Sequence, residues 1–218
     1  MNQDLTDRIS YEMRSKPVSE LLNLYERGLL DLEPGFQRKS VWRIGDRQKL
    51  IESILRHYPL PAIFLYKRAE GGSIAYDVID GKQRLESIFM FMGAIRGRFE
   101  VKYALNPEDV KGCDWTLLKR RKMQHLISDY ELSVIHVDGS FSDIIDLFVK
   151  INSTGKALTR QEKANAKFFS SPFLKEADKV ARKFTGYFKE SGVLSDTQIS
   201  RMKHVELVSE LMLSLHKG

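Results

Sequence analysis

The residues whose types and spacing are best suited to binding or catalysis lie at the end of an apolar run, in the stretch Asp80-Gly81-Lys82-Gln83-Arg84. A glycine placed directly after a strand lets the backbone come close to a ligand, and the free N–H groups of a helix start attract anions. The planar guanidinium of Arg84 matches two phosphate oxygens. A strand, a glycine turn and a basic helix start therefore predict a phosphate-binding turn.

The same stretch also fits an ordinary helix start. Asp80 and Gln83 are three residues apart, which is the spacing of a capping box with aspartate as the cap. This alternative explains two residues and leaves Gly81 and Arg84 without a role. The residues alone leave both interpretations open.

Two further polar stretches could approach such a site. Gln37 and Arg38 follow a Pro34-Gly35 turn, where Arg38 could contact phosphate and Gln37 a water or a base edge. The alternative is a polar loop between Phe36 and Trp42 as core anchors. The second stretch is 152–155.

In that stretch, Asn152 and Gly155 could simply end a helix, because both residue types tolerate the left-handed conformation. Asn152, Ser153 and Thr154 together present several oxygens and donors, which could bind Mg²⁺ or nucleotide oxygens. Glu162, three residues after Thr159, fits a capping box that opens the next helix.

Composition narrows the class of protein without naming a partner. The chain has 218 residues and a formal charge of +6, an excess that allows nucleic acid or nucleotide phosphate as a partner. Lys119, Arg120, Arg121 and Lys122 form a dense basic patch, either a solvated face or a contact to phosphate backbone. One cysteine, Cys113, fits a reducing interior, and we see neither a transmembrane run nor a signal peptide. We therefore expect a cytoplasmic protein that does not enter a membrane.

Several familiar sites are absent from the sequence. There is no Walker-type P-loop, no G-x-G-x-x-G, no H-E-x-x-H, no C-x-x-C and no G-x-S-x-G elbow. The five histidines form no metal-ligand pair at helical spacing. Classical hydrolase and zinc chemistry are therefore disfavoured.

Apolar spacing and turn residues predict an α/β part followed by a helical part, with the change near residue 140. Helices are expected at 18–27, 46–58, from 81, at 115–127, 141–151, from 159, from 172 and at 205–215, and strands at 62–68, 74–79, 98–103 and 130–137. The turn at 69–73 suggests that the two central strands form a hairpin. The expected domains are 1–139 and 140–218, the second contributing residues 152–155 to the same site.

The order of these motifs resembles a known family. The stretches LEPGFQRKSVW, YDVIDGKQRLESI and LFVKINSTGKALTRQEKANA are similar to those of the GmrSD-type N-terminal domain, over about 18–166. This resemblance implies a ParB/sulfiredoxin-like α/β fold with a helical extension. The family's D-G-Q-Q-R motif corresponds to Asp80–Arg84, with Lys82 in place of the first glutamine.

The resemblance also implies an activity. In this family the motif is linked to binding and hydrolysis of a nucleoside triphosphate, and many members are modification-dependent restriction enzymes in phage defence. Arg84 and the Gly81 region would then grip phosphate, Gln83 and Asp80 would position water or Mg²⁺, and Lys82 would strengthen phosphate binding or alter hydrolysis. Gln37, Arg38, Asn152, Ser153, Thr154 and Gly155 would complete the site, for GTP, ATP, CTP or UTP.

The expected partners are the nucleotide, DNA, a nuclease domain or subunit beyond Gly218, and a second copy of the chain. The main rival is a non-catalytic module that binds DNA or senses its modification. A direct nuclease is disfavoured by the lack of an acidic or histidine metal cluster. An inert scaffold would bind no ligand at all.

Overall fold

The computed structural model describes residues 9–34, 42–70, 73–102, 112–152, 164, 166–168 and 171–217. The chain divides into two compact units, one formed by 1–32 and 42–139 and the other by 33–41 and 140–218. Within the described residues, no helix is both long enough and apolar enough to cross a bilayer.

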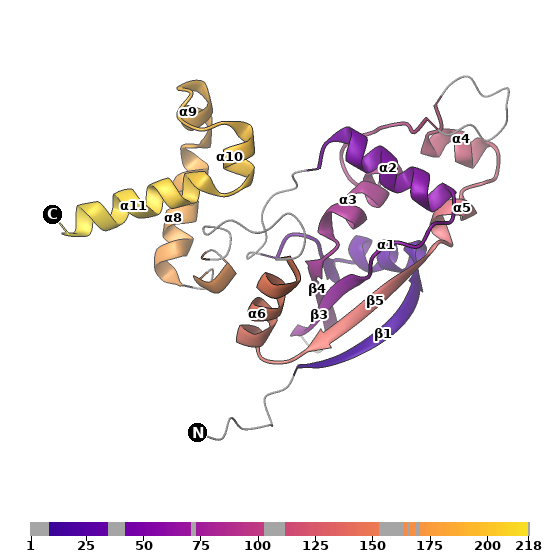
Figure 1. Ribbon diagram of the computed structural model, residues 1–218, viewed down its shortest axis with the longest axis horizontal. Helices are drawn as coiled ribbons and strands as arrows, with labels where there is room; N and C mark the ends of the chain where they lie inside the picture. The colour runs from indigo at the N-terminus through magenta and orange to yellow at the C-terminus, as the bar shows by residue number, and fades with distance from the viewer. Residues whose placement is uncertain are drawn as a thin grey trace. The chain divides into compact units, whose positions relative to one another are not determined.

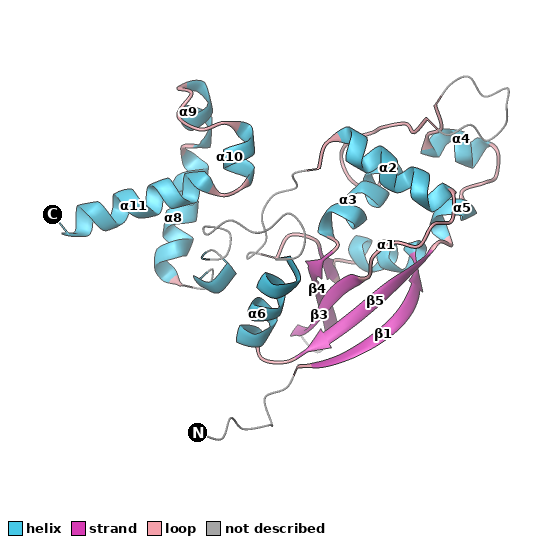
Figure 2. Cartoon of the chain, in the orientation of Figure 1, coloured by secondary structure: helices cyan, strands magenta, loops and turns pink. Residues whose placement is uncertain are grey.

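The first unit is built on a mixed five-stranded sheet in the order β1-β5-β3-β4-β2 (Figures 1 and 2). Its strands are β1 (Ser10–Pro17), β2 (Leu30–Asp31), β3 (Ile63–Glu70), β4 (Ser73–Asp80) and β5 (Glu131–Asp138). β3 and β4 form the expected antiparallel hairpin, while β3 runs parallel to β5 and β2 runs parallel to β4. The predicted mixed α/β class with a small sheet is confirmed.

The helices of the first unit are α1 (Val18–Glu26), α2 (Ile44–Leu55), α3 (Lys82–Phe91), α4 (Trp115–Arg120) and α5 (His125–Ser128). Their apolar faces and the sheet bury one continuous core, in which Leu21, Ile51, Ile63 and Phe89 are fully enclosed. This core fixes the end of β4 against the start of α3, where the predicted site lies.

Two sequence expectations for this unit are wrong in detail, and one strand was not expected. The single helix expected at 115–127 is two short helices, because α4 ends at Arg120 and Lys122 adopts a positive φ of 56°. The strand expected at 98–103 is reduced to one bridge between Val101 and Cys113 in the described residues. β1 was not predicted from the sequence, because its residues are mostly exposed and give no apolar run.

Every regular element in the described part of 140–217 is a helix: α6 (Phe141–Asn152), α8 (Pro172–Lys183), α9 (Thr185–Glu190), α10 (Asp196–Ser200) and α11 (Lys203–Lys217). Ser171 caps α8 by accepting the Leu174 N–H at 3.2 Å, with Pro172 in the first turn as expected. Leu174, Ala177, Phe188, Leu194 and Val205 share a separate small core.

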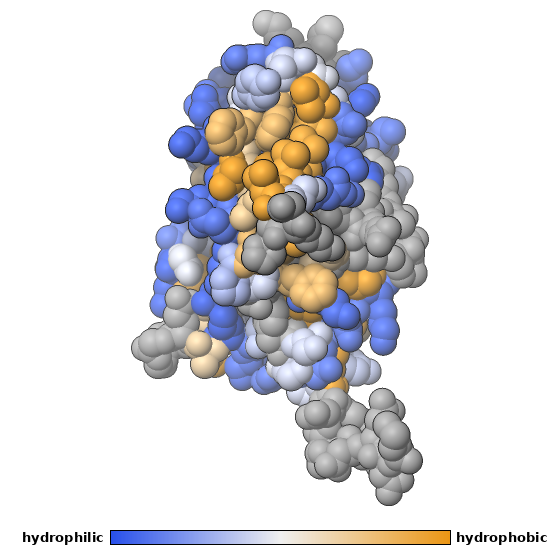
Figure 3. Space-filling view, turned by 90° about the vertical axis from the view of Figure 1, so that its left-hand side faces the viewer, coloured by the Kyte–Doolittle hydropathy of each residue, from blue (hydrophilic) through white to orange (hydrophobic). Residues whose placement is uncertain are grey.

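The helical unit also exposes large apolar side chains. Phe173, Phe184, Tyr187, Val193, Leu211, Leu213 and Leu215 are each at least 40% exposed. Figure 3 shows hydrophobic side chains gathered on one face of the molecule. Exposed apolar area of this kind marks a candidate contact surface.

Candidate functional site

The turn between β4 and α3 requires glycine at position 81. Gly81 is the N-cap of α3 and has a φ of +98°, which L residues rarely adopt. A Cβ at this position would lie 2.3 Å from Ile63 Cδ1, on the neighbouring strand β3. Gly81 therefore packs the start of α3 tightly against β3. The close approach of the backbone to a ligand, which the sequence predicted at this glycine, stays a prediction.

The capping-box interpretation of Asp80 and Gln83 is wrong. Gly81, not Asp80, occupies the N-cap, and it has no side chain with which to cap the helix. Asp80 instead accepts from Arg84, and the Gln83 Oε1 accepts the backbone N–H of Trp42 at 2.7 Å. The first turn of α3 contains no acidic residue. An anion is therefore the natural complement to the positive end of the α3 dipole.

Arg84 is held by protein groups rather than pointing freely outward. Its Nη2 donates to Asp80 Oδ2 at 2.5 Å and to the Ala62 carbonyl at 3.1 Å, so it ties α3 to β4 and to the start of β3. Its side chain is 12% exposed. The Nε is buried without a hydrogen-bond partner among the described residues. Arg84 is thus a prepositioned cation whose donors are only partly used within the described structure.

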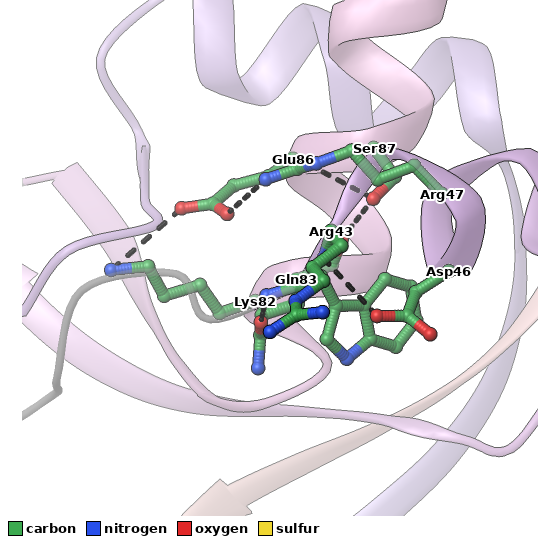
Figure 4. A network of polar contacts seen from close by, with 8 residues as sticks. Arg43, Asp46, Arg47, Lys82, Gln83, Glu86 and Ser87 are labelled. Carbon is green, nitrogen blue, oxygen red and sulfur yellow. Dashed lines mark hydrogen bonds and ion pairs between the residues drawn. The ribbon is translucent and has the colours of Figure 1, made fainter. Parts of the chain in front are cut away.

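A buried polar network links this turn to α2 (Figure 4). Arg47 Nη1 donates to the Ser87 hydroxyl at 3.0 Å, and Ser87 donates to the Gln83 carbonyl at 2.5 Å. Ser87 is completely buried and Arg47 is 8% exposed. The network fixes Gln83 from both its backbone and its side chain, so its amide is rigidly oriented at the helix start.

Glu86 stands between two buried cations. Its carboxylate lies 3.7 Å from Arg47 Nη2 and 3.7 Å from Lys82 Nζ, and all three residues are at most 9% exposed. Figure 4 shows Glu86 reaching toward both partners. At 3.7 Å these contacts are ion pairs and not hydrogen bonds. Together with the Asp80–Arg84 pair, the cluster combines three cationic side chains with two carboxylates.

The structure describes only part of the predicted site. Asp80, Gly81, Lys82, Gln83 and Arg84 meet at the β4–α3 turn. Asn152 is the last residue of α6, in the second unit. Gln37, Arg38, Ser153, Thr154 and Gly155 lie outside the described residues.

The buried partners of this turn were not predicted from the sequence. Glu86 follows Lys82 by four residues, so helical spacing could have indicated the pair. Arg47 and Ser87 are 40 residues apart in the sequence, and no local pattern joins them.

The described residues provide limited coordination for a metal. They contain no group of three or more His, Cys, Asp and Glu side chains placed to hold an ion. Mg²⁺ in nucleotide sites is commonly held by one or two carboxylates together with the phosphates. Asp80, whose side chain is one-third exposed and uses Oδ2 for Arg84, fits this sparse mode.

The basic patch lies elsewhere in the first unit, on α4 and the turn after it. Lys119, Arg120, Arg121 and Lys122 are all exposed. Lys119 also places its Nζ 5.6 Å from the centre of the Trp115 ring. Trp115, Phe91, Phe99, Arg98 and Lys119 line part of a pocket of about 440 Å³ beside this patch. Basic and aromatic side chains therefore meet at the far end of α3.

Most of the chain matches one family of known proteins. A family model described as "GmrSD restriction endonuclease, N-terminal domain" matches residues 18–169. No curated protein matches the chain. One solved structure, "Structure of the C2221 form of Pnob8-like ParB-N domain", is similar at 12% identity and a TM-score of 0.35. The match covers 93% of this chain and 63% of that one, so the chain spans less than two thirds of that protein's length.

Proposed function

Because the chain belongs to the family of GmrSD restriction endonuclease N-terminal domains, as its motifs predicted, we propose that it binds and hydrolyses a nucleoside triphosphate. In this proposal it is the regulatory domain of a DNA-directed, modification-dependent restriction protein that acts against phage. The nuclease belongs to another domain or subunit. The nucleotide is GTP, ATP, CTP or UTP, bound with Mg²⁺.

The observation that carries the proposal is the cationic, buried start of α3. The helix begins at a left-handed glycine and has no acid in its first turn. Lys82, Arg84 and Arg47 lie around this start, and they exceed by one positive charge the two carboxylates, Asp80 and Glu86, that pair with them. Burial lowers the local dielectric, so positive charge there attracts phosphate more strongly than it would at an exposed surface. These features support a triphosphate as the ligand of the turn.

The residues divide into holding and positioning roles. The α3 amides near Gly81, with Lys82 and Arg84, would bind phosphate oxygens and neutralise charge that develops during transfer. Gln83, fixed by Trp42 and Ser87, would orient the attacking water. Asp80 would hold Arg84 and contribute a carboxylate oxygen toward Mg²⁺, which supplies further charge neutralisation when bound. Gln37, Arg38 and residues 152–155 would complete the site.

The test is nucleotide-dependent thermal stabilisation of the wild type and of Arg84→Ala and Arg84→Lys. We expect one of GTP, ATP, CTP or UTP, with Mg²⁺, to raise the melting temperature of the wild type only. Arg84→Lys keeps the charge but loses the planar fork, so it should recover little. Circular dichroism must first establish that both variants fold, because each alters the hydrogen bonds that Arg84 donates to Asp80 and to the Ala62 carbonyl.

Arg182→Ala is the matched control. Arg182 pairs with Asp178 at 2.7 Å, with the same four-residue spacing, on the exposed side of α8. This variant should keep the full nucleotide-induced shift. An equal shift in Arg84→Ala would overturn the assignment of the site, and no shift in the wild type at millimolar nucleotide would overturn nucleotide binding itself.

A second candidate function is a non-catalytic module that binds DNA or senses its modification. The exposed Lys119–Lys122 patch beside the aromatic pocket favours it, because cations bind the phosphate backbone and aromatic rings stack on bases. This alternative predicts DNA affinity that falls steeply with salt and does not respond to nucleotide. Replacing Arg120 and Arg121 with glutamine should reduce the salt slope by roughly one for each phosphate that is no longer neutralised. If the salt dependence of DNA affinity were the same in this variant as in the wild type, the Lys119–Lys122 patch would be excluded as the DNA-binding surface.

A further inference from the structure

Among the residues that the structure describes, no strand pairs with the outer edge of β1. In the described structure it pairs with β5 alone, over the full stretch from Ser10 to Pro17. Tyr11 and Met13 are 73% and 65% exposed on one face of this strand. Open edges are templates for pairing with another strand, and most proteins block them. β1 lies at the margin of the sheet in Figures 1 and 2.

The hydrogen-bond phase of β1 shows which backbone groups face outward. The Val18 N–H donates to the Tyr130 carbonyl at 3.0 Å, directly after the strand pair that ends with Pro17 opposite Glu131. Antiparallel pairs alternate between bonded and non-bonded, so Lys16, Arg14 and Glu12 bond to β5. The N–H and C=O groups of Tyr11, Met13 and Ser15 therefore point away from the sheet. The backbone of Pro17 also points away from β5, so the N–H that proline lacks removes no hydrogen bond between β1 and β5.

This phase limits how a second strand can pair. A two-fold dimer uses the same strand on both copies in antiparallel orientation, and an outward residue must face another outward residue. A register is centred on the residue that faces its own counterpart in the second copy. A register centred on Glu12 or on Arg14 places identical charges opposite each other. A register centred on Ser15 places Arg14 opposite Lys16. These registers are disfavoured because like charges directly opposite each other are destabilising. Centring the pair on Tyr11 brings no opposite charges together.

The register centred on Met13 matches opposite charges on both sides. Met13 then faces Met13 of the second copy, and Tyr11 faces Ser15. Glu12 faces Arg14 of the second copy in the non-bonded, closer type of pair, and Arg14 faces Glu12 in return. Within one copy, Glu12 and Arg14 already form an exposed ion pair at 2.8 Å, so both side chains extend along this edge.

We propose that β1 is a self-association surface, on which a second copy of this chain pairs antiparallel through Met13 and extends the sheet across the dimer. Tyr11 and Met13 of both copies would then form one apolar strip on the face they share. Pairing of two strands of this length buries less surface than a standard protein–protein interface, which buries about 1,600 Å². The dimer is therefore weak and depends on concentration. The proposal is independent of the nucleotide site.

The test measures the mass in solution by sedimentation over a series of concentrations. It compares the wild type, the single variants Glu12→Arg and Arg14→Glu, and the double variant that carries both substitutions, called the double exchange. The wild-type mass should rise from 25.2 kDa toward twice that value. Each single reversal sets like charges opposite each other and should abolish the rise. The double exchange restores both opposite-charge pairs and should restore the dimer. Because it replaces the same two residues as the single variants, such a rescue would come from the charge pairing and not from either native side chain.

A matched control is Glu176→Arg, which reverses an exposed charge paired with Lys179 at 3.6 Å in the helical unit. It should dimerise like the wild type. A wild type that stays monomeric at the highest concentration overturns the proposal and would leave the edge to a foreign peptide. Dimerisation of the single reversals, or failure of the double exchange to rescue it, overturns this register.

Discussion

At the scale of single residues, Lys82 is the side chain that most changes the electrostatics of the β4–α3 turn. It stands where the related motif carries glutamine, yet it is only 6% exposed and pairs with Glu86. A buried lysine is costly unless it is paired or serves a ligand. Its position at the first residue of α3 places this charge beside the proposed phosphates.

We therefore expect Lys82→Gln to weaken nucleotide affinity by about tenfold, or ~1.4 kcal/mol, because one buried cation is lost. Calorimetric titration with the nucleotide that stabilises the wild type measures this directly. Lys179→Gln removes an exposed lysine paired with Glu176 and should leave the affinity unchanged. Equal affinities for Lys82→Gln and the wild type would show that this charge does not contribute to nucleotide binding.

His136 gives a residue-scale prediction about pH. Burial holds its pKa below the ordinary value of 6.5, and the nearby Lys16 and Arg14 lower it further, against Glu12 and Glu20. The unfolded chain therefore takes up the proton first as pH falls. The contribution of His136 to the free energy of unfolding should be fully present above pH 6.5, decrease below it, and level off below the folded pKa.

Urea unfolding at a series of pH values tests this prediction. His136→Gln should lose the component of the pH dependence that begins near 6.5. The control His125→Gln, an exposed position on α5, should keep the wild-type profile. A His136→Gln profile that parallels the wild type throughout this range would contradict the argument.

At the scale of elements, the junction of β3, β4 and α3 depends on Gly81. We expect Gly81→Ala to destabilise the fold by several kcal/mol, because a Cβ would collide with Ile63 and φ is +98°. Gly28→Ala is the matched control, since its φ is +69° but nothing lies within 4 Å of its Cβ. It should cost only about 1 kcal/mol. Denaturant unfolding compares the two, and equal losses would show that crowding by Ile63 is unimportant.

The elements also show what the sequence could predict. The core helices α1, α2 and α3 and the β3–β4 hairpin follow from apolar spacing and turn residues, which are local signals. β1 gives no such signal, because its pairing with β5 joins segments far apart in the sequence and leaves its side chains mostly exposed. The break after α4 depends on the left-handed Lys122, a residue type with no preference for that conformation.

The site was predictable to the same local extent. The glycine turn and the basic helix start are contiguous, so their grouping at one place could be read from the chain. The Asp80–Gln83 cap was wrong because Gly81 already begins the helix and Asp80 pairs with Arg84. The contacts of Arg47 with Ser87 and Glu86 cross from α2 to α3, and only the fold brings them together.

At the scale of the whole molecule, the two units have separate apolar cores. The stability of each unit can therefore change separately when a ligand binds. We propose that Asn152, which ends α6, and the following residues 153–155 contribute to the nucleotide site from the second unit. A ligand bound by both units stabilises both, whereas a ligand bound by the first unit alone leaves the second unchanged.

We expect nucleotide to raise the melting temperature of both units and to slow hydrogen exchange in the α3 amides and in the α8–α11 amides. Asn152→Ala should retain the protection of α3 partly and lose that of α8–α11, because the second unit no longer engages the ligand. Ser209→Ala is the control, since its hydroxyl donates to the Val205 carbonyl within α11. Protection confined to α3 in the wild type would restrict the site to the first unit and leave Asn152 as a simple helix end.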